Sequence, residues 1–383
     1  MDAEWRFNGG ARIFFVWEQR TSNQTSFLGC SRWQEKTVMP AKVTDPRLSR
    51  KISVRDPLGC GIFGRRLHTV LYFKSVTKED SGWLVAGWIR ESLGIALVEQ
   101  PLLGGRLKRV GDSEGEFEIV SNDSGVRLME ARTSMALSEF LELKDWEAVE
   151  ADQLVFWKDI DEQNPQFYPL FYVQVTNFER GGYSIGISCS LLADPLGMAS
   201  FLKRWASIHN TLVSENDKSK LPIFYLLSLR RLNDTPSIHM ISSNTSRNRA
   251  RAKIFNMAEN MNSDDKICRT VASVCIEEAK CHLGTKMASK YWLFLKKLSE
   301  DIKIEACSKE EIVPLSISGL SELRWDDSGV HEVAFFQGNR PIHVSFWIGS
   351  LINDGLVIIA PSSSDEGCSG MNVVVTTPEE EKI

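Results

Sequence analysis

The sequence lacks any apolar run of roughly 18 or more residues, so it predicts no helix that crosses a membrane. Its N-terminal stretch has charged residues throughout and lacks the apolar core of a secretory signal peptide. The net charge of -5 supplies no excess of positive charge for binding nucleic acid or an anionic lipid surface. We therefore expect a cytoplasmic protein without a nucleic-acid partner.

The cysteines form no C-x-x-C pair, and the histidines complete no zinc-ligand spacing. The sequence therefore predicts no metal site. We expect reduced thiols, as in a cytosolic protein. The cysteines are Cys30, Cys60, Cys189, Cys268, Cys275, Cys281, Cys307 and Cys368.

A chain of 383 residues is too long for one ordinary core and suits two domains. Hydrophobic periodicity predicts elements of both kinds. Strands are expected over 67–73, 169–178 and 183–190, and helices over 80–97 and 194–209.

Residues 211–252 are polar and broken, which indicates a crossover between two halves of the chain. We expect an N-terminal domain over 1–210 and a C-terminal domain over 253–383. Residues 1–66 look irregular, and 261–303 are expected to be mostly helical. The pattern as a whole predicts a mixed fold of α and β elements.

The most informative segment ends at Asp194. A glycine pair, an alternating strand, a short turn and this aspartate precede a helix that carries Phe201 and Trp205. This order of features resembles the signature of the plant BAHD acyltransferases, which read His-x-x-x-Asp at the end of such a strand. Here the position four before Asp194 is Ser190.

The resemblance rests on six blocks that follow one another in the order of the family. They lie at residues 101–107, 122–131, 169–182, 186–206, 332–341 and 354–378. It implies two similar mixed-sheet domains of the chloramphenicol-acetyltransferase-like type, joined by a long crossover and separated by a ligand tunnel. It also implies acyl-CoA as co-substrate and a small alcohol or amine acceptor, with no resident cofactor. We expect a monomer.

Both family signatures are degenerate in this chain. The spacing from Gly186 to Asp194 is one residue shorter than the family's, and Ser190 replaces the histidine. The second signature reads EVAFFQGNRP, and the residues that it keeps are Phe335, Gly338 and Pro341. This double loss resembles the ECERIFERUM2-like branch, which is implicated in very-long-chain fatty acid elongation for surface wax. Those relatives usually keep the histidine.

Acyl transfer from a thioester needs a base that takes the proton of the acceptor, and a positioned histidine suits that role. Ser190 cannot replace it, because a hydroxyl is a poor base. Cys189 would be a nucleophile only with a base and a lowered pKa. His209 lies about 22 Å from Asp194 along the expected helix, which leaves His68 as the alternative base that is hardest to dismiss.

The retained Asp194 and Gly197 are expected to serve the fold, with Asp194 as the N-cap of the helix. One local basic run consists of Arg247, Arg249, Arg251 and Lys253. The family tunnel would place it near the phosphates of acyl-CoA. A solvated linker explains the same run.

Two functions of different classes remain open. The first is a BAHD-type acyltransferase whose chemistry is weak or lost. The second is a non-enzymatic accessory protein of very-long-chain fatty acid elongation or cuticular wax biosynthesis, with an elongase subunit as partner at the endoplasmic reticulum. A mispredicted gene product would also explain the shortened motif and the poorly matching residues 211–300.

Overall fold

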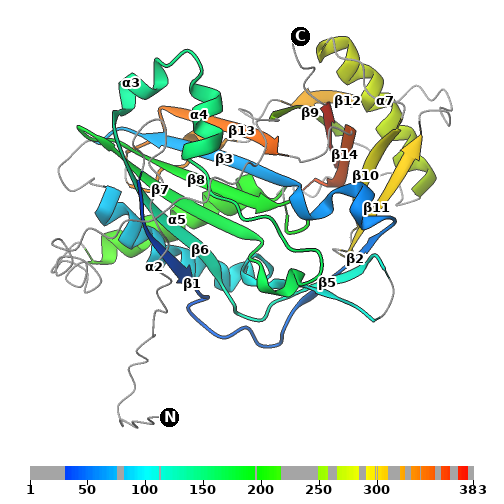
Figure 1. Ribbon diagram of the computed structural model, residues 1–383, viewed down its shortest axis with the longest axis horizontal. Coiled ribbons are helices and arrows are strands. Elements are labelled where there is room, and N and C mark those ends of the chain that lie inside the picture. The colour runs from blue at the N-terminus through cyan, green and yellow to red at the C-terminus, as the bar shows by residue number, and fades with distance from the viewer. Residues whose placement is uncertain are drawn as a thin grey trace, which may run out of the picture.

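Figure 1 shows the computed structural model of the chain, which describes most of its residues. The described ranges are 31–75, 82–111, 114–194, 196–216, 249–257, 265–283, 290–297, 299, 301–308, 320–323, 329–336, 338–349, 355–362 and 370–377.

The architecture mixes strands and helices, which confirms the predicted fold class. The strands are β1 Ser31–Val38, β2 Ser49–Val54, β3 Arg66–Phe73, β4 Arg106–Arg109, β5 Glu116–Val120, β6 Val126–Ala136, β7 Phe171–Glu179, β8 Tyr183–Ser190, β9 Arg249–Met257, β10 Lys290–Lys296, β11 Ile302–Ser308, β12 Leu320–Leu323, β13 His343–Gly349, β14 Gly355–Pro361 and β15 Met371–Thr377. The α-helices are α1 Pro57–Cys60, α2 Gly82–Glu99, α3 Leu137–Leu141, α4 Trp146–Gln153, α5 Met198–Asn216 and α7 Asp265–Leu283. Short 3₁₀ turns are η1 Ile62–Gly64, η2 Pro101–Gly104, η3 Pro165–Phe167 and η6 Val330–Glu332.

The strands form two mixed sheets that meet at β9. The first has the order β1-β6-β7-β8-β3-β13, and the second continues as β9-β15-β14-β10-β11-β2-β5-β4, with β12 beside β9. The junction between β13 and β9 is narrow, because only Ile348 and Gly349 pair across it. Most neighbours are antiparallel, whereas β6–β7, β10–β14 and β11–β2 are parallel.

The two halves of the chain exchange strands. β13 comes from late in the sequence and pairs along its length with β3 in the first sheet. In return, β2 pairs with β11 in the second sheet and brings β5 and β4 with it. The two sheets therefore do not follow the order of the sequence. The predicted division at 211–252 stays a prediction, since 217–248 lie outside the described residues.

Five predicted elements are confirmed, four of them within two residues at each end, whereas α5 begins four residues later and ends seven residues later than expected. They are the strands β3, β7 and β8 and the helices α2 and α5. β8 is buried along its whole length, which explains its clear apolar signal. The sequence predicted its bounds of 183–190 correctly.

Two predictions were wrong. Residues 1–66 contain β1 and β2, and β2 alternates exposed and buried residues as a half-buried strand does. Residues 261–303 contain helix α7, but β10 and the start of β11 follow it. The segment KYWLFLK of β10 is rich in aromatic side chains, which favour strands over helices, and five of its residues are buried.

Helices cover the sheets on defined faces (Figure 1). α2 and α5 pack on each other and on the face of the first sheet that carries Leu67, Leu71 and Ile187. α3 and α4 contribute to a separate apolar cluster with Val70 and Tyr72. The alternating side chains of β3 therefore contact different layers on its two faces. α7 packs on β15, β14, β10 and β9 of the second sheet.

His209 lies near the middle of α5 and is completely buried. Its Nδ1 lies 3.0 Å from Ser92 Oγ on α2, and that oxygen also accepts the Trp205 indole N–H at 2.9 Å. The rings of Phe335 and Phe336 meet the imidazole edge to face, at 5.3 and 5.1 Å. Burial lowers the pKa of His209 to about 3, so the ring is neutral at ordinary pH.

We predict that His209 makes the fold acid-labile below about pH 6.5, the ordinary pKa of histidine. Between about pH 6.5 and pH 3 His209 is protonated in the unfolded chain but neutral in the folded chain. The free energy of unfolding therefore decreases as the pH decreases through this interval. Urea unfolding at pH 7 and pH 5 should show that His209→Gln loses about 2 kcal/mol less stability than the wild type over this interval. Equal losses in both proteins would contradict the assignment.

Candidate functional site

The turn after β8 holds the residue that stands where the resemblance expects a histidine. Ser190 is fully buried, and its backbone N–H donates to the carbonyl of Leu170 at 2.8 Å. Its Oγ accepts the N–H of Leu192 at 3.3 Å, and its carbonyl accepts the N–H of Ala193 at 3.0 Å. Ser190 therefore closes a tight turn with its own polar groups.

Asp194 connects this turn to α5 and to the second sheet. Its Oδ1 accepts the N–H of Gly197 at 3.1 Å, which satisfies a backbone donor at the approach to the helix. Its Oδ2 accepts from Lys296 Nζ on β10 at 3.1 Å. In addition, the Arg50 guanidinium donates to the carbonyl of Ala193. The carboxylate is thus engaged in structural contacts.

Gly197 is required by the close approach of the aspartate. A Cβ at this position would lie 2.6 Å from Oδ2 and 2.8 Å from Cγ of Asp194, inside van der Waals contact. The N–H of Gly197 can reach the carboxylate because no side chain stands between them. The retained glycine and aspartate therefore form one structural unit.

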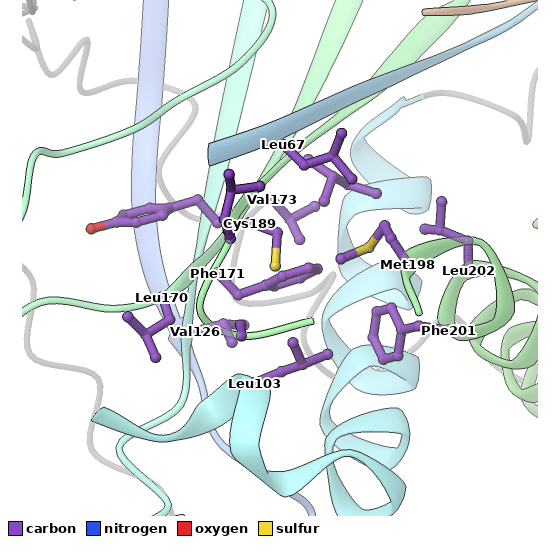
Figure 2. Packing of buried hydrophobic residues seen from close by; sticks show 14 of the residues in the cluster. Leu67, Leu103, Val126, Leu170, Phe171, Val173, Cys189, Met198, Phe201 and Leu202 are labelled. Atoms are coloured by element: carbon purple, nitrogen blue, oxygen red, sulfur yellow. The ribbon is translucent and has the colours of Figure 1, made fainter. Parts of the chain in front are cut away.

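Cys189 points to the opposite face of β8, into the apolar core. Figure 2 shows its sulfur among the side chains of Phe171, Met198 and other apolar residues. Burial raises the pKa of the Cys189 thiol to about 12, so it stays protonated. A protonated, enclosed thiol is a packing residue and not a nucleophile.

His68 lies next to this turn in space, on the strand beside β8. Its Nε2 accepts the Nε–H of Arg66 at 3.0 Å, because an arginine can only donate. A neutral ring then carries its hydrogen on Nδ1, which lies 2.8 Å from Ser188 Oγ. Both ring nitrogens are therefore engaged within the protein.

The surroundings of His68 form a cluster of buried polar and aromatic side chains on one face of the sheet. The Trp347 ring stacks on His68 at 4.9 Å. The Arg66 guanidinium lies over the Trp157 ring at 5.7 Å and lies 3.6 Å from the carboxylate of Asp159. We call Arg66, His68, Ser188, Trp157 and Trp347 the β3 cluster. The sequence had marked only His68 among them.

The remnant of the second signature packs against α5. Phe335 is fully buried between Phe73, Trp205 and His209. Gly338 has a φ of 78°, in the left-handed region, and Pro341 stands just before β13. These retained residues lie in the segment that leads into β13, and Phe335 packs this segment against α5.

The basic run is described only in part. Arg247 lies outside the described residues, as do the side chains of Arg249 and Arg251 on β9. Lys253, also on β9, pairs with Glu322 of β12. The predicted contact with CoA phosphates stays a prediction.

The described ranges contain neither a metal-binding cluster nor a membrane-spanning helix. No group of three or more His, Cys, Asp and Glu side chains there could hold a metal ion. None of the helices in those ranges is long and apolar enough to cross a membrane. Six cysteines of the described ranges are free thiols, while Cys30 and Cys368 lie outside them.

Three residues that reach this region were missed from the sequence. Arg50 and Lys296 contact the turn from strands far away in the chain, and Arg66 contacts it through strand pairing, opposite Ser190. Charged residues at the ends of otherwise apolar strands were the available signal for Arg66 and Lys296, since buried charges need partners. Their partners depend on the strand order, which the sequence alone did not predict.

Comparison with known proteins identifies relatives of one kind. The model of the Transferase family matches residues 32–280, more than half of the chain. A hydroxycinnamoyltransferase of Narcissus pseudonarcissus is 32% identical over 174 residues, which cover 45% of this chain and 38% of the relative. Protein ECERIFERUM 26-like of Arabidopsis thaliana is 30% identical over 158 residues, which cover 40% of this chain and 36% of the relative. The aligned part thus spans less than two fifths of either relative.

Among solved structures, vinorine synthase aligns with 92% of this chain and 95% of its own, at 16% identity and a TM-score of 0.43. An apo TRI101 of F. graminearum aligns with 87% of this chain and 95% of its own, at 10% identity and a TM-score of 0.41.

We predict that Gly197→Ala lowers the free energy of unfolding by about 1–3 kcal/mol, because the new methyl group overlaps the carboxylate of Asp194. In an Asp194→Ala background the same change should cost much less, since the overlapping atoms are gone. Urea unfolding of the four proteins in this double-mutant cycle measures the difference. Additive effects would contradict the proposed contact.

Proposed function

Because the chain belongs to the Transferase family, the BAHD acyltransferases, we propose that it binds an acyl-CoA and has lost the family's rapid acyl transfer. The observation that carries this proposal is the turn after β8. Its polar groups are a buried serine hydroxyl and a carboxylate held by Lys296 and Gly197. Neither group is suited to accept the proton of an alcohol or amine.

The loss of a general base has a known order of magnitude. A positioned base contributes typically about 10²–10⁴-fold in rate. The Ser190 hydroxyl would need a base of its own before it could act, and it is buried within its turn. The Cys189 thiol cannot take over, because burial raises its pKa to about 12. We infer that acyl transfer at this turn is slower by about that factor than it would be with a positioned base.

His68 is the remaining candidate for a rebuilt base, and its contacts oppose that role. A general base needs a lone pair directed at the proton that it removes. The Nε2 lone pair of His68 accepts from Arg66, and Nδ1 faces Ser188. Protonation would place a second positive charge beside the Arg66 guanidinium. We therefore assign His68 a role in packing and in holding Arg66.

The framework for ligand binding is proposed to persist. Asp194 and Gly197 preserve the start of α5, and Phe335 still fills the space beside Trp205. The basic run that begins at Arg247 is the proposed contact for the CoA phosphates. Lys253 would have to exchange Glu322 for a phosphate.

An accessory role in very-long-chain fatty acid elongation or wax biosynthesis is the alternative function. The likeness to Protein ECERIFERUM 26-like favours it. Binding without turnover agrees with both a silent acyltransferase and an accessory protein. The accessory role predicts that adding the protein to an elongase preparation changes the chain length of the fatty acyl products. A silent acyltransferase would leave that chain length unchanged.

We predict that calorimetry detects binding of a long-chain or aromatic acyl-CoA, whereas thioester hydrolysis and transfer stay near background. Acceptors should include hydroxycinnamate-type compounds and fatty alcohols. Ser190→Ala and His68→Gln should leave the residual rate unchanged within about twofold, because neither side chain supplies a base.

A turnover that either substitution abolishes would overturn the loss of catalysis and identify a rebuilt base. Cys281→Ala is the control variant, since this exposed thiol lies on α7 and outside the turn. Absence of both binding and turnover would reject the acyl-CoA proposal and direct attention to protein partners.

A further inference from the structure

Arg66 is a buried cation at the beginning of β3, directly opposite Ser190 in the neighbouring strand. Its side chain is 3% exposed, and burial lowers its pKa to about 10. Arginine remains charged at any ordinary pH even so. A charge in such surroundings requires hydrogen bonds or an anion to offset its loss of hydration.

The partners of Arg66 offset this charge only in part. Its Nη1 donates to the carbonyl of Gly64 at 2.8 Å, and its Nε donates to the neutral His68. The nearest carboxylate within the described residues, that of Asp159, lies 3.6 Å from Nη1, too far for a good hydrogen bond. The Nη2 group donates to no group in the described part of the chain.

The contrast with Arg106 makes this arrangement informative. Arg106 is also buried, and burial lowers its pKa to about 10 as well. Its guanidinium, however, donates from both amino groups to carbonyls of Gly105, Gly125 and Ser124. Arg106 is thus satisfied by the turns that it holds together, whereas one edge of Arg66 is left for another acceptor.

The guanidinium of Arg66 already faces one carboxylate, that of Asp159. The side chain of Asp159 is 42% exposed, yet its carboxylate lies next to the guanidinium. Arg66 therefore lies just beneath the protein surface on this side, and a ligand that displaces the exposed Asp159 carboxylate would reach it. The Trp157 ring lies beneath the guanidinium, the Trp347 ring stacks on the neighbouring His68, and the indole N–H of Trp157 has no acceptor among the described residues.

We propose that the β3 cluster binds the carboxylate of a free carboxylic acid, with Arg66 as its cationic partner. The planar guanidinium suits a carboxylate, which accepts two parallel N–H bonds. A single cation and two indole rings fit a monoanion with an apolar body better than a phosphate. This inference rests on the proposed function, because it places a non-reacting acid beside the strand end that has lost its base.

The test titrates the full chain with octanoate and follows tryptophan fluorescence and heat. Methyl octanoate serves as the uncharged probe with the same alkyl chain. We expect saturable binding of octanoate and at least about tenfold weaker binding of the ester, because only the acid can accept charge-assisted hydrogen bonds. Inorganic phosphate should not compete at equal concentration.

Two substitutions assign the site. Arg66→Gln should weaken octanoate binding about tenfold or more. Asp159→Asn should strengthen it by about two- to fivefold, because the substitution removes the anion that competes for the guanidinium. Asp161→Asn is the matched control two residues further on, since among the described residues the Asp161 carboxylate bonds within its own loop, to Gln163 and Asn164.

The Asp159→Asn result decides the matter even if Arg66→Gln fails to fold, because Asp159 is exposed. Equal affinities for octanoate and its ester, or unchanged affinity in Asp159→Asn, would overturn the proposal. If octanoate does not bind but acyl-CoA does, the carboxylate site alone is rejected. If the wild type does not bind acyl-CoA, the proposed function is rejected instead.

Discussion

The arrangement of the site depends on the two contacts that the carboxylate of Asp194 makes. The carboxylate accepts a hydrogen bond from the N–H of Gly197 ahead of α5. It also forms an ion pair with Lys296 on β10 of the second sheet. One side chain thus fixes the exit of β8, the entry to α5 and a contact between the two sheets. The side chains of the pair are 26% and 17% exposed, so solvent screens the interaction only in part.

This contact explains why the motif aspartate can persist without the motif histidine. The base serves only the reaction, whereas the aspartate serves the fold through two hydrogen bonds and the glycine that permits one of them. Loss of the base costs rate and leaves stability nearly untouched. Loss of the aspartate would remove one ion pair of Lys296 and the acceptor of the Gly197 N–H ahead of the helix. The two halves of one motif are therefore under different physical constraints.

Local patterns in the sequence were enough for the elements around the site. The apolar strand 183–190 was predicted correctly, because its burial is readable from its own residues. The following helix was also predicted, but its cap was wrong: α5 begins at Met198, and Asp194 accepts the Gly197 N–H ahead of the helix instead of being its N-cap. The two signatures pointed to the family that the comparisons then showed. Strand order was beyond the sequence, since β3 pairs with β13, which lies more than 250 residues further along the chain. For the same reason the β3 cluster, which those strands bring together, was seen only as a lone His68.

The register of β8, β3 and β13 also explains why small residues flank a large one in one row across these strands. Ser190, Arg66 and Gly349 lie side by side across β8, β3 and β13. A Cβ on Gly349 would lie 3.1 Å from His68 Nε2 and 3.3 Å from Arg66 Nε, so a side chain there would displace the bond between them. Interiors are close-packed, so a large guanidinium is accommodated by small neighbours on both sides. A histidine in place of Ser190 would enter the same row and bring a further ring beside a buried cation. The serine and the buried arginine are therefore physically compatible at this strand end.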